Sequence, residues 1–334
     1  MTKTAEELRA IRIQEDRRFV ELPAIKSLRN RLNEFYEHAQ DCLGGGGSRR
    51  RLFAVIGESG TGKSTALMQA LNEMDGLRPY KGENGELRIP FVHVEVSKTS
   101  TNKDVAVQLL KQLGQDADRN AKEDLLYETL KTQLREAGTL LLHIEEAQHL
   151  QKGGTAKAVR NLQDRFKSLL VIPDWPLHLI LSGVEELSEL FMGDQQLANR
   201  SLVMRFEPLK FPGDISLAKT ILNDVAFENC KLKLEKSLET DDFLGRLIQS
   251  TGGGAGTMIE MVRSASYKAL SKGHAKLDPK DFEFVYSRTS GSLPQDNIIT
   301  AKNWGNIDRA NALADLAPTK DKPKHSKKVK GGKE

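Results

Sequence analysis

The chain has 334 residues, of which 38% are hydrophobic and 29% charged, with a formal net charge of +4 at pH 7, as is ordinary for a globular protein. Its most apolar stretch, residues 169–184, is interrupted by Pro173 and Pro176, which excludes a membrane-spanning protein and predicts no membrane partner. The first residues are charged and lack the apolar segment of a secretory signal, so we expect a cytoplasmic protein.

Residues 1–50 are predicted to form an N-terminal helical segment of two helices. The second helix opens at Pro23, because proline is favoured in the first helical turn, and apolar residues follow at helical spacing. A run of four glycines, 44–47, then forms a flexible joint. The two cysteines, Cys42 and Cys230, form no C-x-x-C pair, so neither a disulfide framework nor a cysteine zinc site is expected.

A phosphate-binding loop follows the first apolar run, residues 52–56. The octapeptide Gly57-Glu58-Ser59-Gly60-Thr61-Gly62-Lys63-Ser64 fits the pattern G-x-x-x-x-G-K-S/T without a mismatch. In such a loop, backbone N–H groups and the N-terminus of the next helix hold phosphate oxygens, while the lysine reaches the β- and γ-phosphates and the serine ligates Mg²⁺. These residues, with Thr65, are the predicted site for ATP or GTP and Mg²⁺.

Residues 51–211 are predicted to form an α/β domain around the loop. Further strands are expected at 89–96, 140–144 and 177–181, and helices at 66–74, 104–113 and 125–134. Apolar strands that alternate with helices are typical of a parallel sheet covered on both faces. Residues 212–290 follow a helical pattern throughout and predict a small C-terminal helical lid domain.

Two acidic residues stand at the end of the strand expected at 140–144. Glu145 is placed to help hold Mg²⁺ through water, and Glu146 to polarise the attacking water. The alternative is that both acids only begin a helix, where the helix dipole favours negative charge. The aliphatic run before them and the phosphate loop upstream favour the catalytic interpretation.

Three further residues are candidates for the reaction. Ser182 follows the strand at 177–181 and is placed to hydrogen-bond the γ-phosphate or the attacking water, although Ser-Gly after a strand is usually a turn. Arg200 or Arg205, just before the helical domain, can reach the γ-phosphate bound by a neighbouring subunit. For either arginine, a surface salt bridge is an equally weighted alternative.

This order of motifs resembles the AAA+ ATPases, and more narrowly the TniB/TnsC-type transposition ATPases, with MuB as a distant relative. The resemblance covers residues 20 to 290. It rests on the helix at Pro23, the loop 57–64, the segment 144–148, Leu181-Ser182-Gly183, the box 205–209 and the glycine-rich helix start 252–256. It implies an AAA+ P-loop NTPase fold.

The resemblance also implies the roles of single residues. Lys63 and Ser64 hold ATP and Mg²⁺, Glu146 is the catalytic base, Ser182 is a sensor residue, and Arg200 or Arg205 is a finger that acts in trans. Two positions depart from the family. Glu145 stands where the family has aspartate, which implies slower turnover, and the lid helix begins without the usual arginine, leaving Arg263 as a substitute.

The implied function is an ATP-dependent assembly, a ring or a helical filament, on double-stranded target DNA that recruits and activates a transposase and works with a target-selector protein. Lys98 and Lys103 are the candidate DNA contacts, with solvated helix-start residues as the alternative. Two other functions stay open. One is a replication initiator or helicase loader, and the other is a signalling or scaffold protein that uses nucleotide only as a switch.

Residues 291–334 are predicted to be a flexible basic tail. Trp304 and Ile307 are isolated apolar positions that suggest a short docking segment. The last part, residues 318–334, carries seven lysines against Asp321 and Glu334, a local charge of +5 that leaves the rest of the chain at about −1. We expect this part to stay extended and to anchor DNA through its phosphates, with a handle for a protein partner as the alternative.

Overall fold

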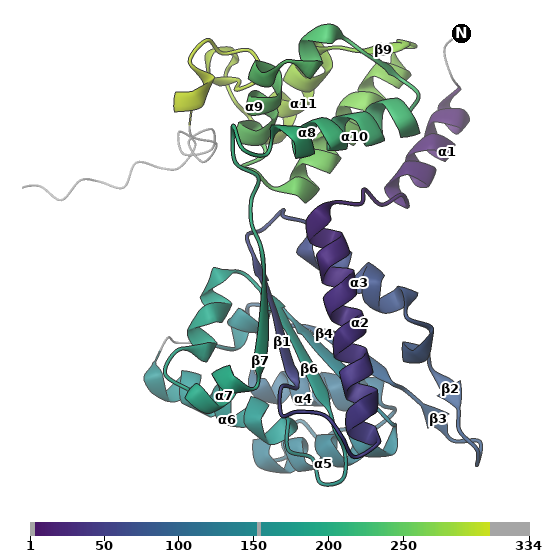
Figure 1. Cartoon of the computed structure of the whole chain (residues 1–334), viewed down its shortest axis with the longest axis vertical. Coiled ribbons are helices and arrows are strands. Elements are labelled where there is room, and N and C mark those ends of the chain that lie inside the picture. Colours follow the sequence, from purple (N-terminus) through teal and green to yellow (C-terminus); the bar gives the residue numbers. More distant parts are fainter. Residues whose placement is uncertain (1–3, 152–154, 308–334) are drawn as a thin grey trace, which may run out of the picture.

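The computed structural model describes residues 4–151 and 155–307, which form two lobes joined by the segment that follows the last strand of the main sheet (Figure 1). One lobe is a sheet with helices on both faces, and the other is largely helical. The predicted lysine tail, residues 318–334, lies outside the described residues. No helix within the two described ranges is long and apolar enough to cross a membrane.

The main sheet has five parallel strands in the order β4-β5-β6-β1-β7. Their bounds are β1 Leu52–Gly57, β4 Phe91–Glu95, β5 Leu141–Glu145, β6 His178–Gly183 and β7 Ser201–Phe206. The central strands β1 and β6 are buried along their whole length, which is why apolar residues predominate in β1 and in the centre of β6. The predicted α/β fold with a parallel sheet is confirmed.

The sequence did not predict the edge strand β7. Leu202 and Val203 are 38% and 44% exposed, so the strand has no continuous buried run that would mark it. The strand expected at 89–96 is shorter than predicted and begins at Phe91. Pro90 precedes it and lacks the backbone N–H that a strand ladder needs.

Helices cover both faces of the sheet. They are α2 Pro23–Leu43, α3 Lys63–Glu73, α4 Asn102–Gln112, α5 Glu123–Glu136, α6 Ala156–Leu169 and α7 Gln195–Asn199. Side chains alternate along β1, so that Phe53 and Val55 join the core beneath α2 and α3, while Ala54 and Ile56 join the core beneath α4, α5 and α6. Helix α2 begins at Pro23, as predicted. The sequence did not predict α6.

The second lobe forms a lid above the sheet. Its helices are α8 Ile215–Leu222, α9 Asp241–Ser250, α10 Ala255–Ser271 and α11 Pro279–Ser290, and a π-helical turn, Asn223–Asn229, follows α8. The apolar core beneath α2 and α3 continues into these helices. The N-terminal helix α1, Ala5–Asp16, packs against α10 rather than against the sheet (Figure 1).

The expectation that residues 212–290 are helical throughout was wrong in one detail. Two short strands, β8 Lys233–Leu234 and β9 Lys276–Leu277, pair in parallel within the lid. A pairing of two residues between distant segments leaves no local pattern in the sequence. A second small pair, β2 Tyr80–Lys81 with β3 Leu87–Arg88, extends from the sheet lobe and was also not predicted.

The segment around Trp304, which lies within the flexible tail expected from residue 291, packs on the lid. The Trp304 ring meets the ring of Phe211 edge-on at 5.7 Å, and its indole N–H donates to Asp242 at 2.9 Å. The guanidinium of Arg246 lies over the same ring, and the Gln249 amide donates to the carbonyl of Ile307. The described residues beyond α11 therefore pack on the lid.

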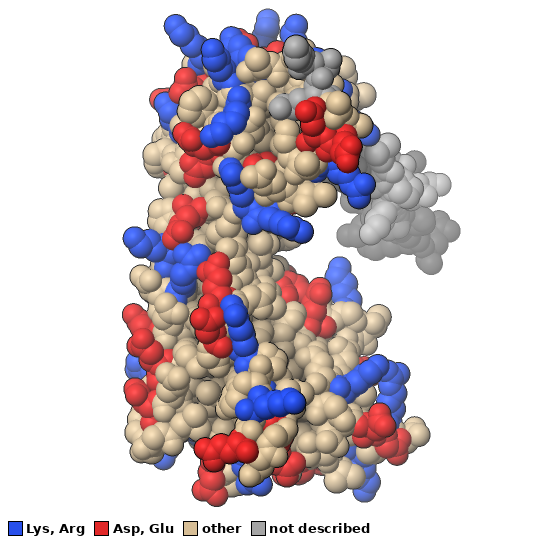
Figure 2. Space-filling view, turned by 90° about the vertical axis from the view of Figure 1, so that its right-hand side faces the viewer, with Lys and Arg blue, Asp and Glu red and all other residues tan. Residues whose placement is uncertain are grey.

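Charged side chains of both signs are interspersed over the two lobes. Figure 2 shows this on one face of the molecule, together with a hollow between the lobes. A continuous basic stripe is the footprint expected of a preformed path for DNA. Among the described residues of that face, no such stripe is present.

Candidate nucleotide site

The phosphate loop joins β1 to α3 at the carboxyl end of the sheet. Gly60 and Gly62 have φ values of +82° and +88°, which glycine adopts without steric cost. The Thr61 hydroxyl donates to the carbonyl of Glu58 at 2.8 Å and closes the turn. Helix α3 begins at Lys63, so its N-terminus faces the loop, where backbone N–H groups and the helix dipole attract anions.

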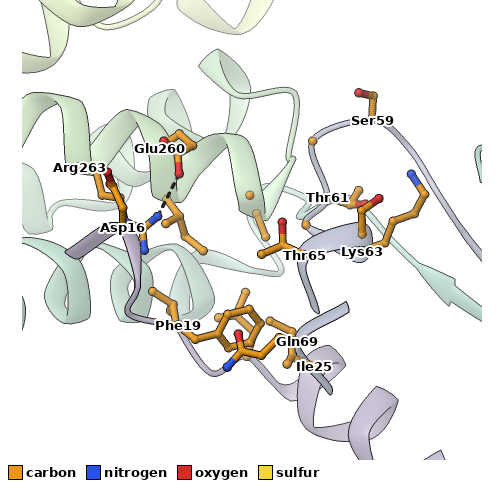
Figure 3. Close-up of a pocket in the computed structure, with 18 of the residues that line it drawn as sticks. Asp16, Phe19, Ile25, Ser59, Thr61, Lys63, Thr65, Gln69, Glu260 and Arg263 are labelled. Atoms are coloured by element: carbon orange, nitrogen blue, oxygen red, sulfur yellow. Dashed lines mark hydrogen bonds and ion pairs between the residues drawn. The ribbon is translucent and has the colours of Figure 1, made fainter. Parts of the chain in front are cut away.

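A cavity of about 390 Å³ opens beside this loop. The loop, the start of α3, the end of α1 with the segment that leads to α2, and the first turns of α10 line it. Figure 3 shows Phe19 and Ile25 at one end, and Ser59 and Lys63 at the other. One end is apolar and the other is lined by phosphate-loop residues, an arrangement that suits a base and a phosphate chain.

The lid reaches into the site through the first turn of α10. The Thr257 N–H donates to the carbonyl oxygen of Gly60 at 3.0 Å. A Cβ atom at Gly256 would lie 2.9 Å from that same oxygen and 3.1 Å from the Gly62 Cα atom, so only glycine allows this approach. Two helix N-termini, those of α3 and α10, therefore line the cavity and give it positive potential.

Glu145, predicted to help hold Mg²⁺ through water, lies beside Ser64. A hydrogen bond with the His93 ring, 3.1 Å from Glu145 Oε2, and another from the Ser64 hydroxyl hold the pKa of the Glu145 carboxyl well below its usual range. The carboxylate thus stays ionised at neutral pH. A hydroxyl and a carboxylate oxygen are ligands that suit Mg²⁺, so the residues present fit this ion.

Glu146 lines the cavity next to the phosphate-loop lysine. Its Oε1 atom lies 3.9 Å from the Lys63 ammonium, and the Gln148 side-chain amide donates to its Oε2 atom at 2.6 Å. The backbone of Glu146 has a φ of 54°, a left-handed conformation that is uncommon outside glycine. The side chain is 27% exposed, so solvent reaches its carboxylate.

Ser182 is placed differently from the prediction. It pairs with Glu145 across β5 and β6, so it stands at the expected edge of the sheet. Its side chain is fully buried, however, and its hydroxyl lies 2.8 Å from His143 Nε2. Ser182 is not among the residues that line the cavity. The expected contact with a γ-phosphate or a water therefore needs a rearrangement of this hydrogen bond.

The two candidate arginines lie near opposite ends of the strand β7. Arg205 pairs with Ile56 in the strand register, beside the phosphate loop, and its guanidinium forms an ion pair with Glu185. Arg200 precedes β7, and its carbonyl accepts from the Leu52 N–H at the amino edge. At about 3.3 Å per residue, roughly 16 Å of strand separates that edge from Gly57. The structure thus distinguishes two residues that the sequence left equivalent.

The two lysines predicted to contact DNA lie close together in the chain. Lys98 is exposed in the loop after β4, and Lys103 stands in the first turn of α4. Strand β4 ends at the same edge of the sheet as the phosphate loop. However, β4 is three strands away from β1, and neither lysine lines the cavity. Their contact with DNA stays a prediction.

Several residues of the site were not predicted. His93 was missed because nothing in its strand marks a histidine that will face an acid on the neighbouring strand. The segment 16–25 lines the cavity, although it lies more than thirty residues before the loop. Arg263, which the sequence left as a substitute for the usual lid arginine, also lines the cavity, and its guanidinium pairs with Glu260 at 3.0 Å (Figure 3). The same guanidinium donates to the carbonyl of Arg18 at 2.6 Å.

Residues 46–191 match the family model described as the AAA domain. Among solved structures, the chain is similar to the Orc2 protein of Aeropyrum pernix in ADPNP–ADP complexes, with 13% identity, 82% of this chain and 71% of that chain covered, and a TM-score of 0.55. It is also similar to Cdc6p of Pyrobaculum aerophilum, with 14% identity, coverage of 89% and 74%, and a TM-score of 0.54. The Orc1 protein of A. pernix in complex with DNA gives 14% identity, coverage of 81% and 67%, and a TM-score of 0.55.

The chain therefore has the AAA+ P-loop NTPase fold, as predicted, and an AAA domain that spans the phosphate loop and β5. No curated protein matches the chain. These matches do not confirm the narrower resemblance to the TniB/TnsC-type proteins, which stays a prediction.

Proposed function

We propose that this chain is an AAA+ ATPase that assembles as a homo-oligomer on double-stranded DNA and recruits a transposase. One observation supports the ATPase activity above the others. The phosphate loop and Glu146 line a single cavity that also has an apolar end for a base, and Glu145 is hydrogen-bonded to Ser64 of the loop. The A. pernix Orc2 protein of similar fold was solved in ADPNP–ADP complexes, which supports the same use of this cavity.

The binding step uses the loop and the two helix N-termini. Backbone N–H groups and Lys63 hold the phosphates, while Ser64 and Glu145 hold Mg²⁺, which neutralises charge on the transferred phosphoryl group when it is bound. The Glu146 carboxylate is the anionic neighbour of Lys63, at 3.9 Å. A γ-phosphate takes over that role, so that nucleotide binding releases Glu146.

The hydrolytic step then depends on Glu146. Its released carboxylate orients a water molecule and accepts the proton as the water attacks the γ-phosphate. Arg200 supplies positive charge to the phosphate of a neighbouring subunit. Within the described residues its side chain has no hydrogen bond or ion pair, and it stands too far from its own phosphate loop to serve that loop. Arg205 is already paired with Glu185.

The contact with DNA is assigned to Lys98, Lys103 and the lysine tail, through phosphates rather than base edges. The Orc1 protein of similar fold was solved in complex with DNA, which supports DNA as the binding partner of these lysines. Assembly on any duplex suits a regulator that marks target DNA for a transposase, together with a target-selector protein.

The experiment is ATP turnover with and without duplex DNA, for the wild type and Glu146→Gln. DNA should stimulate the wild type, whereas the variant should bind ATP, fail to turn it over and persist on DNA, because an amide cannot accept the proton. Unchanged turnover in the variant would contradict the role of Glu146. ATP binding without turnover in the wild type would favour the scaffold alternative, which the replacement of aspartate by Glu145 already suggests.

The second candidate is a replication initiator, which the fold likeness to Orc and Cdc6 proteins favours. An initiator reads base edges at its origin, whereas contact with phosphates alone carries no sequence information. Competition of labelled duplex with unrelated duplexes distinguishes the two. Equal competition by all duplexes supports the transposition role, and a preference of about 10³-fold or more for one sequence supports the initiator.

A further inference from the structure

Three side chains with metal-binding atoms lie close together near the amino ends of the strands, at the end of the sheet opposite the phosphate loop. His38 and Cys42 lie one turn apart on α2, and His178 is the first residue of β6. One ligand atom from each residue lies within 4.8 Å of the other two. His178 is fully buried, and Cys42 is 8% exposed. The spacing of His38 and Cys42 places both side chains on the same face of the helix.

Hydrogen bonds fix the orientation of both rings. His178 Nδ1 lies 2.8 Å from the carbonyl oxygen of Pro176, so this nitrogen carries the proton and donates it. The lone pair of His178 Nε2 therefore faces His38 Nδ1, at 2.8 Å. A backbone carbonyl that orients a histidine in this way is the usual outer partner of a metal-binding imidazole.

Both imidazoles are neutral at physiological pH. Burial lowers the pKa of His178 to about 4, and it also lowers the pKa of His38. A neutral ring can offer a lone pair to a metal without first losing a proton to solvent. Protonation of the rings therefore does not oppose a cation, whereas Arg51, which lies near both rings, does.

The glycine run after α2 covers the third ligand. A Cβ atom on Gly47 would lie 2.3 Å from the Cys42 sulfur, so the chain approaches the thiol only because glycine stands there. The next residue, Ser48, is exposed, and its Oγ atom lies 3.1 Å from His38 Nε2. Solvent can enter from this side.

We propose that His38, Cys42 and His178 bind one Zn²⁺ ion, with a water molecule as the fourth ligand. The three ligands would be His38 Nδ1, Cys42 Sγ and His178 Nε2. Imidazole nitrogen and thiolate are the donors that zinc prefers. This site is separate from the Mg²⁺ ligands Ser64 and Glu145, which stand at the other edge of the sheet.

Zinc binding would move two protons. In the metal-free chain, His38 Nδ1–H donates to His178 Nε2, and His38 Nε2 accepts from the Ser48 N–H at 2.9 Å. On binding, the Cys42 thiol releases its proton to solvent, and the His38 proton moves from Nδ1 to Nε2, where Ser48 Oγ accepts it. The exposed Ser48 N–H turns to water.

The geometry needs an adjustment at more than one separation, because the three ligand atoms lie within 4.8 Å of one another and a tetrahedral zinc brings sulfur and nitrogen to about 3.5 Å. Two nitrogens at about 2.0 Å from a tetrahedral zinc lie about 3.3 Å apart, so the 2.8 Å contact between the rings must widen by about 0.5 Å. The Cys42 sulfur lies 3.9 Å from His38 Nδ1, close to the separation that a tetrahedral site requires. Arg51 lies near both histidines and opposes a cation, while Asp41 and the new thiolate offset it.

The ion would join the end of α2 to the start of β6. Helix α2 continues from the segment that lines the nucleotide cavity, so the site would hold this helix against the sheet. Because the metal binds the folded chain alone, it should stabilise that chain in proportion to its free concentration.

The test is metal binding by the full chain, with Co²⁺ as a spectroscopic probe and Zn²⁺ as competitor. The wild type should bind one equivalent of Co²⁺ with a thiolate-to-cobalt charge-transfer band, and Zn²⁺ should remove that band. Cys42→Ala should lack the band, and His38→Gln should bind at least about 10-fold more weakly. Cys230→Ala is the matched control, because Cys230 is also buried but is not part of this cluster and should keep the band.

A cooperative thermal unfolding transition of each variant, measured without metal, shows that the chain still folds. Zinc should raise the unfolding temperature of the wild type and Cys230→Ala, but not that of Cys42→Ala. Absence of the band in the wild type would overturn the proposal. So would equal metal binding by Cys42→Ala, or loss of the band in Cys230→Ala.

Discussion

Thr257 in the lid donates its backbone N–H to the carbonyl oxygen of Gly60 in the phosphate loop, at 3.0 Å. The lid and the loop therefore share one hydrogen bond at the cavity, and a shift of one moves the other. Gly256 makes the approach possible, since a side chain there would collide with backbone atoms of the loop.

Gly256→Ala should weaken nucleotide binding. The added methyl group must displace the lid or the loop, and overpacking of this kind costs about 1 kcal/mol or more, at least about fivefold in affinity. Titration calorimetry with ATP measures this loss of affinity. Gly213→Ala is the control, because a Cβ atom there meets nothing closer than 3.8 Å. Equal affinity of both variants would show that the contact between lid and loop does not shape the site.

His93→Ala should reduce the contribution of Mg²⁺ to nucleotide binding. The His93 ring holds the Glu145 carboxylate at 3.1 Å, and loss of such an outer partner costs about 10- to 100-fold in metal affinity. The measurement is the affinity for ATP of the wild type and the variant, once with Mg²⁺ and once with a chelator. The variant should bind ATP more weakly than the wild type with Mg²⁺, and equally well with the chelator. His149→Ala is a suitable comparison, since His149 faces Glu146 instead, at 3.7 Å, and should leave the Mg²⁺ effect intact.

Arg200→Ala should be inactive alone and regain turnover when mixed with Lys63→Ala protein. A mixed interface then contains one intact phosphate loop and one intact arginine. Arg205→Ala should show no such recovery, because its guanidinium pairs with Glu185 of its own chain. If Arg205→Ala regained turnover in the mixture and Arg200→Ala did not, Arg205 and not Arg200 would be the residue that acts in trans.

The metal-free chain should lose stability in mild acid through His178. Burial lowers the pKa of His178 to about 4 in the folded state, so between about pH 6.5 and pH 4 the unfolded chain binds a proton that the folded chain does not. The free energy of unfolding should therefore fall by about 2 kcal/mol between pH 7 and pH 5 from this residue. Urea unfolding with a chelator present measures it, and His178→Gln should show a shallower pH dependence. An identical dependence in the two proteins would contradict the prediction.

Local sequence predicted the parts of the site that depend on neighbours in the chain. The loop from Gly57 to Ser64 is one continuous motif, and Glu145 and Glu146 end a buried run. Contacts that depend on packing were not predictable in this way. His93 meets Glu145 across two strands, and Thr257 meets Gly60 after nearly two hundred intervening residues. The strand β7 was missed because an exposed edge strand carries no buried run.

The Cys42 cluster shows the same limit. Cys42 has no cysteine partner close by in the sequence. Its two histidine neighbours come from its own helix and from a strand 140 residues beyond His38. The spacing of His38 and Cys42 was the only local signal, and alone it is too common to predict a site.

The most direct test of the account is the binding of Mg²⁺-ATP by the wild type and by Lys63→Ala, measured by titration calorimetry. Lys63 is buried and faces the cavity, so its loss removes both a charge and hydrogen-bond donors from the phosphates. We predict saturable binding by the wild type and a loss of about 3 kcal/mol, roughly 100-fold, in the variant, with Lys98→Ala unchanged. Equal binding by Lys63→Ala and the wild type, or no binding by the wild type, would contradict the nucleotide site.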